Sequence, residues 1–149
     1  MIDMHGTLDM ATATAAGSTK HRSFARAGHE AGASKRIAKP GQVFSRVHVD
    51  DLASVLIASI ARPRPGAVYN VCDDEPASPA EVVAHAAQLL GVPTPPLVPF
   101  DDATLSPMAR SFYADNKRVA NALIKTELGV RLRYPDYHAG LAAILAAGG

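Results

Sequence analysis

The fold is decided by a stretch that opens with Phe44-Ser45-Arg46-Val47-His48-Val49-Asp50-Asp51-Leu52-Ala53 and closes with Ala67-Val68-Tyr69-Asn70-Val71-Cys72. Valines alternate around the histidine as in a short strand, whereas the apolar residues from Leu52 to Ile60 recur with helical spacing. The period changes at Asp50-Asp51, and either carboxylate can accept a hydrogen bond from the amides of a first helical turn. Strand 47–49, helix 51–61 and strand 68–71 are therefore predicted, with the strands parallel and Leu56 buried against them.

Four segments of the chain resemble, in the correct order, segments of one known superfamily. They are Ser45–Ala53, Tyr69-Asn70-Val71, Ser78-Pro79-Ala80-Glu81-Val82-Val83, and Ala114–Arg118 together with Glu127-Leu128-Gly129. They are similar to the His-Val-x-Asp-Leu-Ala segment, the following Tyr-Asn-Leu/Val strand, the next helix and the late Asp-x-x-Lys helix of the extended short-chain dehydrogenase/reductases. This superfamily contains the NAD-dependent epimerases and dehydratases. The match belongs entirely to the C-terminal half of that superfamily.

The predicted fold class is α/β: a small parallel-type sheet with flanking helices, equivalent to the C-terminal part of a Rossmann-type NAD(P)-binding protein. Residues 1–31 are rich in Ala, Gly, Ser and Thr, so we expect a disordered or weakly structured arm. The substrate-side portion is expected to occupy residues 32–149. A solvated arm is the preferred interpretation of the basic residues between Lys20 and Arg46, with phosphate binding as the alternative.

Composition excludes several classes of protein. The 149 residues carry a formal net charge of +1, which gives no argument for binding nucleic acid or an anionic membrane. Cys72 is the single cysteine, so an internal disulfide is impossible and a reducing, cytoplasmic location is expected. No apolar run approaches the roughly 20 residues that span a bilayer.

Further helices are predicted from their end signals. Ser78 and Pro79 should begin a helix that Gly91 ends, with Glu81 placed for a capping box. A short turn is expected after Ser106-Pro107, and a helix from Asp115 or Asn116 to Leu128 that buries Ala120, Leu123, Ile124 and Leu128. A last helix should follow Pro135 and face Leu141, Ile144 and Leu145 inward. Pro99 restricts any strand near Leu97 to a sheet edge.

Catalytic and cofactor-binding residues are not predicted. Tyr113 and Lys117 spell the Tyr-x-x-x-Lys pair of these reductases, but the superfamily carries that pair upstream of its His-Val-x-Asp segment, so we interpret this occurrence as coincidence. The sequence contains no glycine-rich turn that could bring a pyrophosphate to a helix N-terminus. The resemblance therefore implies NAD or NADP only for an intact relative.

Substrate binding is assigned to two arginines. Nucleotide-sugar members of the superfamily hold the substrate phosphates with an arginine four residues before the histidine, and that position is Phe44 here. An aromatic ring cannot replace a guanidinium group, so Arg46 or Arg110 would have to contact an anionic substrate. Solvated surface arginines are the alternative.

Metal binding is not predicted either. The acidic residues Asp73, Asp74, Glu75, Asp101 and Asp102 lack the spacing of a calcium loop and are expected to be solvated. His48 is expected to be a structural core histidine, and Cys72 a buried small apolar group.

The resulting functional prediction is a chain that resembles the substrate-binding part of an NAD(P)-dependent epimerase, dehydratase or oxidoreductase, without cofactor binding or catalysis of its own. In an intact relative this part would select a small-molecule substrate. The alternative is a non-catalytic binding or protein-interaction module. Because the nucleotide-binding half is missing from the match, we also expect uncovered apolar surface and self-association.

Overall fold

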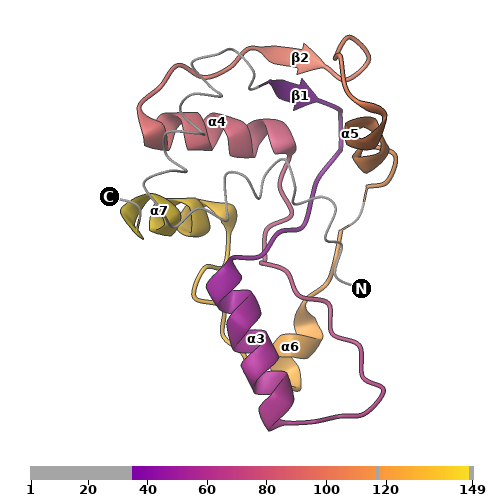
Figure 1. The fold of residues 1–149 in the computed structure, drawn as a ribbon, viewed down its shortest axis with the longest axis vertical. Coiled ribbons are helices and arrows are strands. Elements are labelled where there is room, and N and C mark those ends of the chain that lie inside the picture. The colour runs from indigo at the N-terminus through magenta and orange to yellow at the C-terminus, as the bar shows by residue number, and fades with distance from the viewer. Residues whose placement is uncertain (1–34, 117, 148–149) are drawn as a thin grey trace.

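The computed structural model describes residues 35–116 and 118–147 (Figure 1). Its elements are β1 (Arg36–Ala38), α3 (Val49–Ala61), α4 (Pro79–Leu90), β2 (Leu97–Pro99), α5 (Pro107–Phe112), α6 (Ala122–Thr126) and α7 (Tyr137–Ala147). The arm expected over 1–31 and Lys117 lie outside the described residues. Within those residues, no helix is long and apolar enough to cross a membrane.

The sheet consists of β1 and β2, which pair in parallel with Ile37 opposite Val98. This confirms a small parallel sheet with flanking helices, but the strands are not those that the sequence predicted. Residues 47–48 and 68–71 are not in any strand, and Val49 belongs to α3. The amides of 68–71 donate no hydrogen bond to any described residue, so their alternating pattern has no neighbouring strand to pair with.

The elements around the sheet are layered. α4 packs between the sheet and α7, while α3 and α6 lie together at the other end of the molecule (Figure 1). α4 begins and ends as predicted: Ser78 is the N-cap, Pro79 opens the helix, and Gly91 closes it with φ of 66°. The Ser78 side chain makes no capping hydrogen bond, so the predicted capping box is not formed.

The start of α3 differs from the prediction. His48 is the N-cap, and its Nδ1 accepts a hydrogen bond from the Asp50 amide at 3.2 Å. Asp51 does not cap the helix; its buried carboxylate accepts hydrogen bonds from the amides of Arg133 (2.8 Å) and Tyr134 (2.9 Å). Asp51 thus joins α3 to the segment that precedes α7.

The core beside α3 is built from the side chains of Val55, Ile124, Leu128 and Val130, with Tyr69 and Val71 packed against it. Leu56, expected in the core, is 50% exposed. It lies about 100° around α3 from Val55, and without strands 47–49 and 68–71 no sheet covers that side of the helix.

The predicted helix 115–128 is reduced to α6. Before α6, polar groups bond to distant segments instead of to a helical turn: the Asn116 side chain bonds to Val43 and Gly41, and the Val119 amide to Ser45. Ile124 and Leu128 are buried as expected, whereas Ala120 and Leu123 are exposed. α7 and the short α5, which Ser106 caps, confirm the remaining helices.

Candidate substrate site

Arg46 lies on the connection between β1 and α3. Its Nη1 donates hydrogen bonds to the carbonyls of Phe44 (2.9 Å) and Ala77 (3.0 Å), while Nη2 is buried with no hydrogen-bond partner among the described residues. Burial lowers the pKa of Arg46, and nearby Asp73 opposes that effect. The guanidinium group therefore holds the 44–46 and 77 segments together.

Asp73 is buried, contrary to the expectation that the acidic loop is solvated. It is 5% exposed, and burial raises its pKa to about 7 although Arg46 acts in the opposite direction. Its Oδ1 lacks a hydrogen-bond partner within the described chain. A carboxyl group with this pKa can exchange a proton near neutral pH.

Asp74, beside it in sequence, is exposed and behaves as a surface acid. Its Oδ1 accepts hydrogen bonds from Asn121 (2.6 Å) and Lys125 (2.5 Å), and these bonds lower its pKa. Asp74 and Lys125 line a hollow of about 500 Å³ together with residues 129–132 and 135. Asp74 and Lys125 pair with each other in this hollow, and Arg131, which also lines it, adds a further positive charge.

Three aromatic rings connect the segment of Arg46 to α5. The ring centroids of Phe44 and Tyr113 are 5.6 Å apart, and those of Tyr113 and Phe100 are 5.1 Å apart. Cations lie over both ends: Arg46 over Phe44 at 5.8 Å, and Arg110 over Phe100 at 4.7 Å. The structure thus links the two arginines that the sequence singled out through one aromatic cluster, defined as Phe44, Phe100 and Tyr113.

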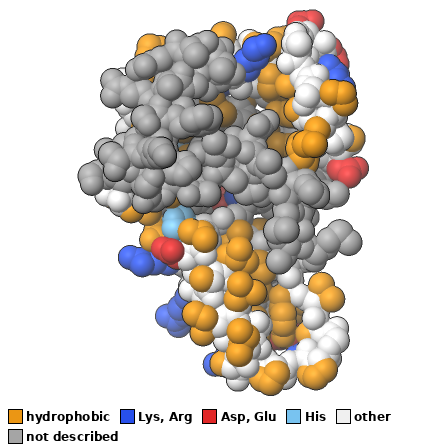
Figure 2. All heavy atoms as spheres, in the orientation of Figure 1, with side chains coloured by type: hydrophobic (Ala, Val, Ile, Leu, Met, Phe, Trp, Pro, Cys, Tyr) orange, Lys and Arg blue, Asp and Glu red, His pale blue; other side chains and the backbone are white. Residues whose placement is uncertain are grey.

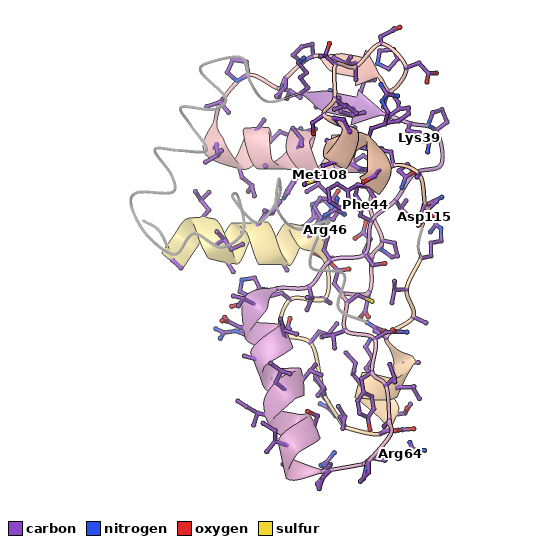
Figure 3. The ribbon with its side chains drawn as sticks, turned by 45° about the vertical axis from the view of Figure 1, so that its right-hand side comes forward. Lys39, Phe44, Arg46, Arg64, Met108 and Asp115 are labelled. Carbon is purple, nitrogen blue, oxygen red and sulfur yellow. The ribbon has the colours of Figure 1, made fainter. Side chains whose placement is uncertain are left out.

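Lys39 adds a third cation to this cluster. Its Nζ lies 5.2 Å from the Phe100 centroid and donates a hydrogen bond to the Tyr113 carbonyl. Figure 3 shows Phe44 and Arg46 together near α5, with Lys39 beside them and Arg64 at the far end of the molecule. Sequence reasoning missed Lys39 and Phe100, since neither lies in a recognisable motif.

The two arginines differ in availability. Arg110 is exposed and makes one hydrogen bond, to the Ala103 carbonyl at 3.3 Å. Arg46 is half-buried, with one nitrogen shared between two carbonyls. Arg110 is therefore the better placed of the two to contact an anion from solution.

A histidine pair lies between α4 and α7. No local pattern predicts this pair, because 53 positions separate its members. The rings of His85 and His138 are 4.3 Å apart, and Tyr137 contacts both. Burial and the proximity of His138 lower the pKa of His85. No cluster of three or more metal-ligating side chains occurs among the residues that the structure describes.

The other predicted residues have structural positions. The His48 ring stacks on Tyr134 with centroids 3.9 Å apart, in keeping with a structural histidine. Cys72 is buried, its Sγ lies 3.3 Å from the Val119 carbonyl, and burial raises its pKa to about 11. Tyr113 ends α5, and Lys117 lies outside the described residues, so the structure does not test the interpretation of that pair as coincidence.

The first turns of α3 and α4 carry acidic residues that disfavour a bound dinucleotide. A bound pyrophosphate needs a glycine-rich turn that opens a helix, with amides and a positive dipole end free of competing anions. α3 instead begins with two acidic residues, and Glu81 lies in the first turn of α4. The glycines with positive φ are in turns or after helices: Gly41, Gly66, Gly91 and Gly129.

Known proteins resemble this chain over part of their length. A conserved protein of unknown function from Silicibacter pomeroyi is 66% identical and superposes with a TM-score of 0.75, over 76% of this chain and 41% of that one. A 3-diazoavenalumate denitrifying reductase from a Streptomyces species is 32% identical over 104 residues, which are 66% of this chain and 33% of the reductase. No protein-family model matches the chain.

A human epimerase family protein solved with NADPH shares the fold at 19% identity and a TM-score of 0.66, over 83% of this chain and 42% of that protein. The chain thus spans about a third of the length of its curated relative and about two fifths of these solved chains. The chain shares part of the fold of a Rossmann-type epimerase family protein. Its resemblance to the C-terminal portion of the extended short-chain dehydrogenase/reductases is confirmed.

Proposed function

We propose that this chain is the substrate-side portion of an NAD(P)-dependent epimerase, dehydratase or oxidoreductase, and that alone it neither binds the cofactor nor catalyses a reaction. The main support is the likeness to the Silicibacter pomeroyi protein, which is high over three quarters of this chain yet reaches only two fifths of that protein. The acidic residues in the first turns of α3 and α4 point the same way, because they disfavour a pyrophosphate at those two helix N-termini.

In this proposal the aromatic cluster is the part that meets the substrate. Arg110 supplies the anion contact, since it is exposed, while Arg46 fixes the position of Phe44 through its backbone hydrogen bonds. The substrate is a small molecule, and the choice between NAD and NADP belongs to the nucleotide-binding half of an intact relative. A cytoplasmic location, expected from the single cysteine, stays a prediction.

Cofactor titration tests the proposal. The isolated chain should produce no saturable change in NADH or NADPH fluorescence. A chimera in which residues 35–147 replace the equivalent part of the human epimerase family protein, which was solved with NADPH, should bind NADPH as well as that parent protein does. Micromolar binding by the isolated chain would contradict the proposal.

A non-catalytic interaction module is the second candidate. It is favoured by the large apolar side chains left exposed on α3, including Ile57 at 68% and Ile60 at 78%. The chimera separates the two candidates: a chimera that folds but has lost cofactor binding would favour the interaction module.

A further inference from the structure

α3 carries apolar side chains on two of its faces. Its inner face carries Val55, 2% exposed, against Ile124 and Leu128. Its outer face carries Val49 (58% exposed), Leu56 (50%), Ile57 (68%) and Ile60 (78%). An apolar face of a helix is normally packed against another element. Figure 2 shows hydrophobic side chains gathered over this end of the molecule.

The outer face has the spacing of a helix-packing seam. Val49, Ala53, Leu56 and Ile60 follow one another at intervals of four, three and four residues. Residues spaced in this way form a straight stripe on a helix and pack into the grooves of a second helix. Ala53, which is exposed, would let the two backbones approach closely.

The distribution of charge favours a second copy of the same helix as the occupant. Residues 52–61 contain no charged side chain, so two identical faces would bring no like charges together. The charges lie at the ends instead: Asp50, with a side chain 55% exposed, lies beside Val49 at the start of the stripe, and Arg62 and Arg64 follow its end. Arg62 also donates a hydrogen bond to the Leu128 carbonyl, and Arg64 forms an ion pair with Glu127. In an antiparallel pair, each Asp50 lies at the end where the other copy carries its arginines. The two helix dipoles are then antiparallel, which is also favourable.

We propose that two copies of this chain associate about a two-fold axis through antiparallel packing of α3, with Val49, Ala53, Leu56 and Ile60 as the seam. A two-fold contact of this kind uses the same patch on both copies. It does not depend on the proposed function, because it requires only the face of α3.

Sedimentation velocity of the full chain tests the contact. The parent should sediment with the mass of two chains and dissociate on dilution. The double variant Leu56→Glu/Ile60→Glu should sediment as one chain, with an unchanged far-ultraviolet circular dichroism spectrum because both positions are exposed. Met108→Glu on α5, where the native side chain is 67% exposed, is the matched control and should stay dimeric.

Cysteine cross-linking tests the direction of packing. Val49→Cys and Ile60→Cys chains, mixed and oxidised, should yield the mixed 49–60 disulfide in preference to 49–49 and 60–60, as mass spectrometry can measure. Native Cys72 is buried, so it should not compete. A preference for the symmetric disulfides would overturn the antiparallel arrangement. A parent chain that is monomeric at all concentrations, or a Leu56→Glu/Ile60→Glu variant that stays dimeric, would overturn the contact itself.

Discussion

The buried carboxylate of Asp51 attaches α3 to the segment that precedes α7. Next to Asp50 at the start of a helix, it has the sequence signature of a cap, yet its carboxylate bonds to the amides of Arg133 and Tyr134, 82 and 83 positions away. Local sequence could not identify these partners, because nothing near Asp51 specifies which distant amides meet it.

We predict that Asp51→Ala destabilises the chain by roughly 1.5 to 3 kcal/mol, the usual contribution of a hydrogen bond to a charged group. Two part-buried amides would lose their acceptor. Urea unfolding measures the change. The control is Asp50→Ala, which should cost less than about 1 kcal/mol since it removes an exposed charge at a helix N-terminus. Equal costs for the two variants would show that Asp51 acts only through the helix dipole.

Asp73 gives a pH dependence whose sign follows from its burial. Its pKa is raised from 3.8 to about 7, so the folded chain holds a proton there that the unfolded chain has released. Protonation of Asp73 therefore contributes fully to the free energy of unfolding below pH 4. This contribution falls as the pH rises toward 7 and does not change further above that pH. We predict that the melting temperature of Asp73→Asn, measured relative to that of the parent, rises as the pH is increased from 4 to 7, because Asn cannot ionise. A difference between the two that does not change with pH would contradict the raised pKa.

At the scale of the elements, helices with local end signals were predictable and strands were not. Ser78, Pro79 and Gly91 define α4 without reference to any other segment. The pairing of β1 with β2 joins residues about 60 positions apart, and Pro99 had marked β2 only as an edge. The alternation at 68–71 is a real pattern, but a strand requires a partner, and none of the described segments supplies one.

The candidate site likewise contains residues that the sequence predicted and residues that only the structure revealed. Arg46 and Arg110 were found by their residue type, whereas Asp73, Lys39 and Phe100 owe their roles to burial or ring contacts. Such contacts are created by the fold. The sequence therefore indicated part of the site but not the aromatic cluster that connects it.

The burial of α6 offers a test of the core around α3. Ile124 is fully buried, and its neighbour Leu123 is 47% exposed. Ile124→Ala should cost about 2 to 5 kcal/mol, since it leaves a cavity among Val55, Leu128 and Val130. Leu123→Ala is the control and should cost well under half as much. Thermal unfolding of both variants checks the assignment of the two faces, and the reverse order of stability would show that α6 is rotated.

At the scale of the whole molecule, the chain is held together by side-chain hydrogen bonds between distant segments more than by a sheet. Asn116 joins to the 41–43 turn, Asn121 to the carbonyls of Cys72 and Asp73, and Arg62 to the carbonyl of Leu128. Bonds of this kind fix where segments lie without giving each backbone amide its own partner. Local stability should therefore differ strongly along the chain.

Native-state hydrogen exchange should reveal that difference. We predict that the amides of 82–90 in α4 exchange slowest, because they are bonded within a helix packed on both the sheet and α7. The amides of 68–71 should exchange close to the unprotected rate, since no described residue accepts a hydrogen bond from them. The measurement also bears on association: packing through α3 leaves 68–71 unprotected. Protection of 68–71 that grows with protein concentration would show that these residues pair as a strand with another chain, and that the alternation in the sequence is used between molecules rather than within one.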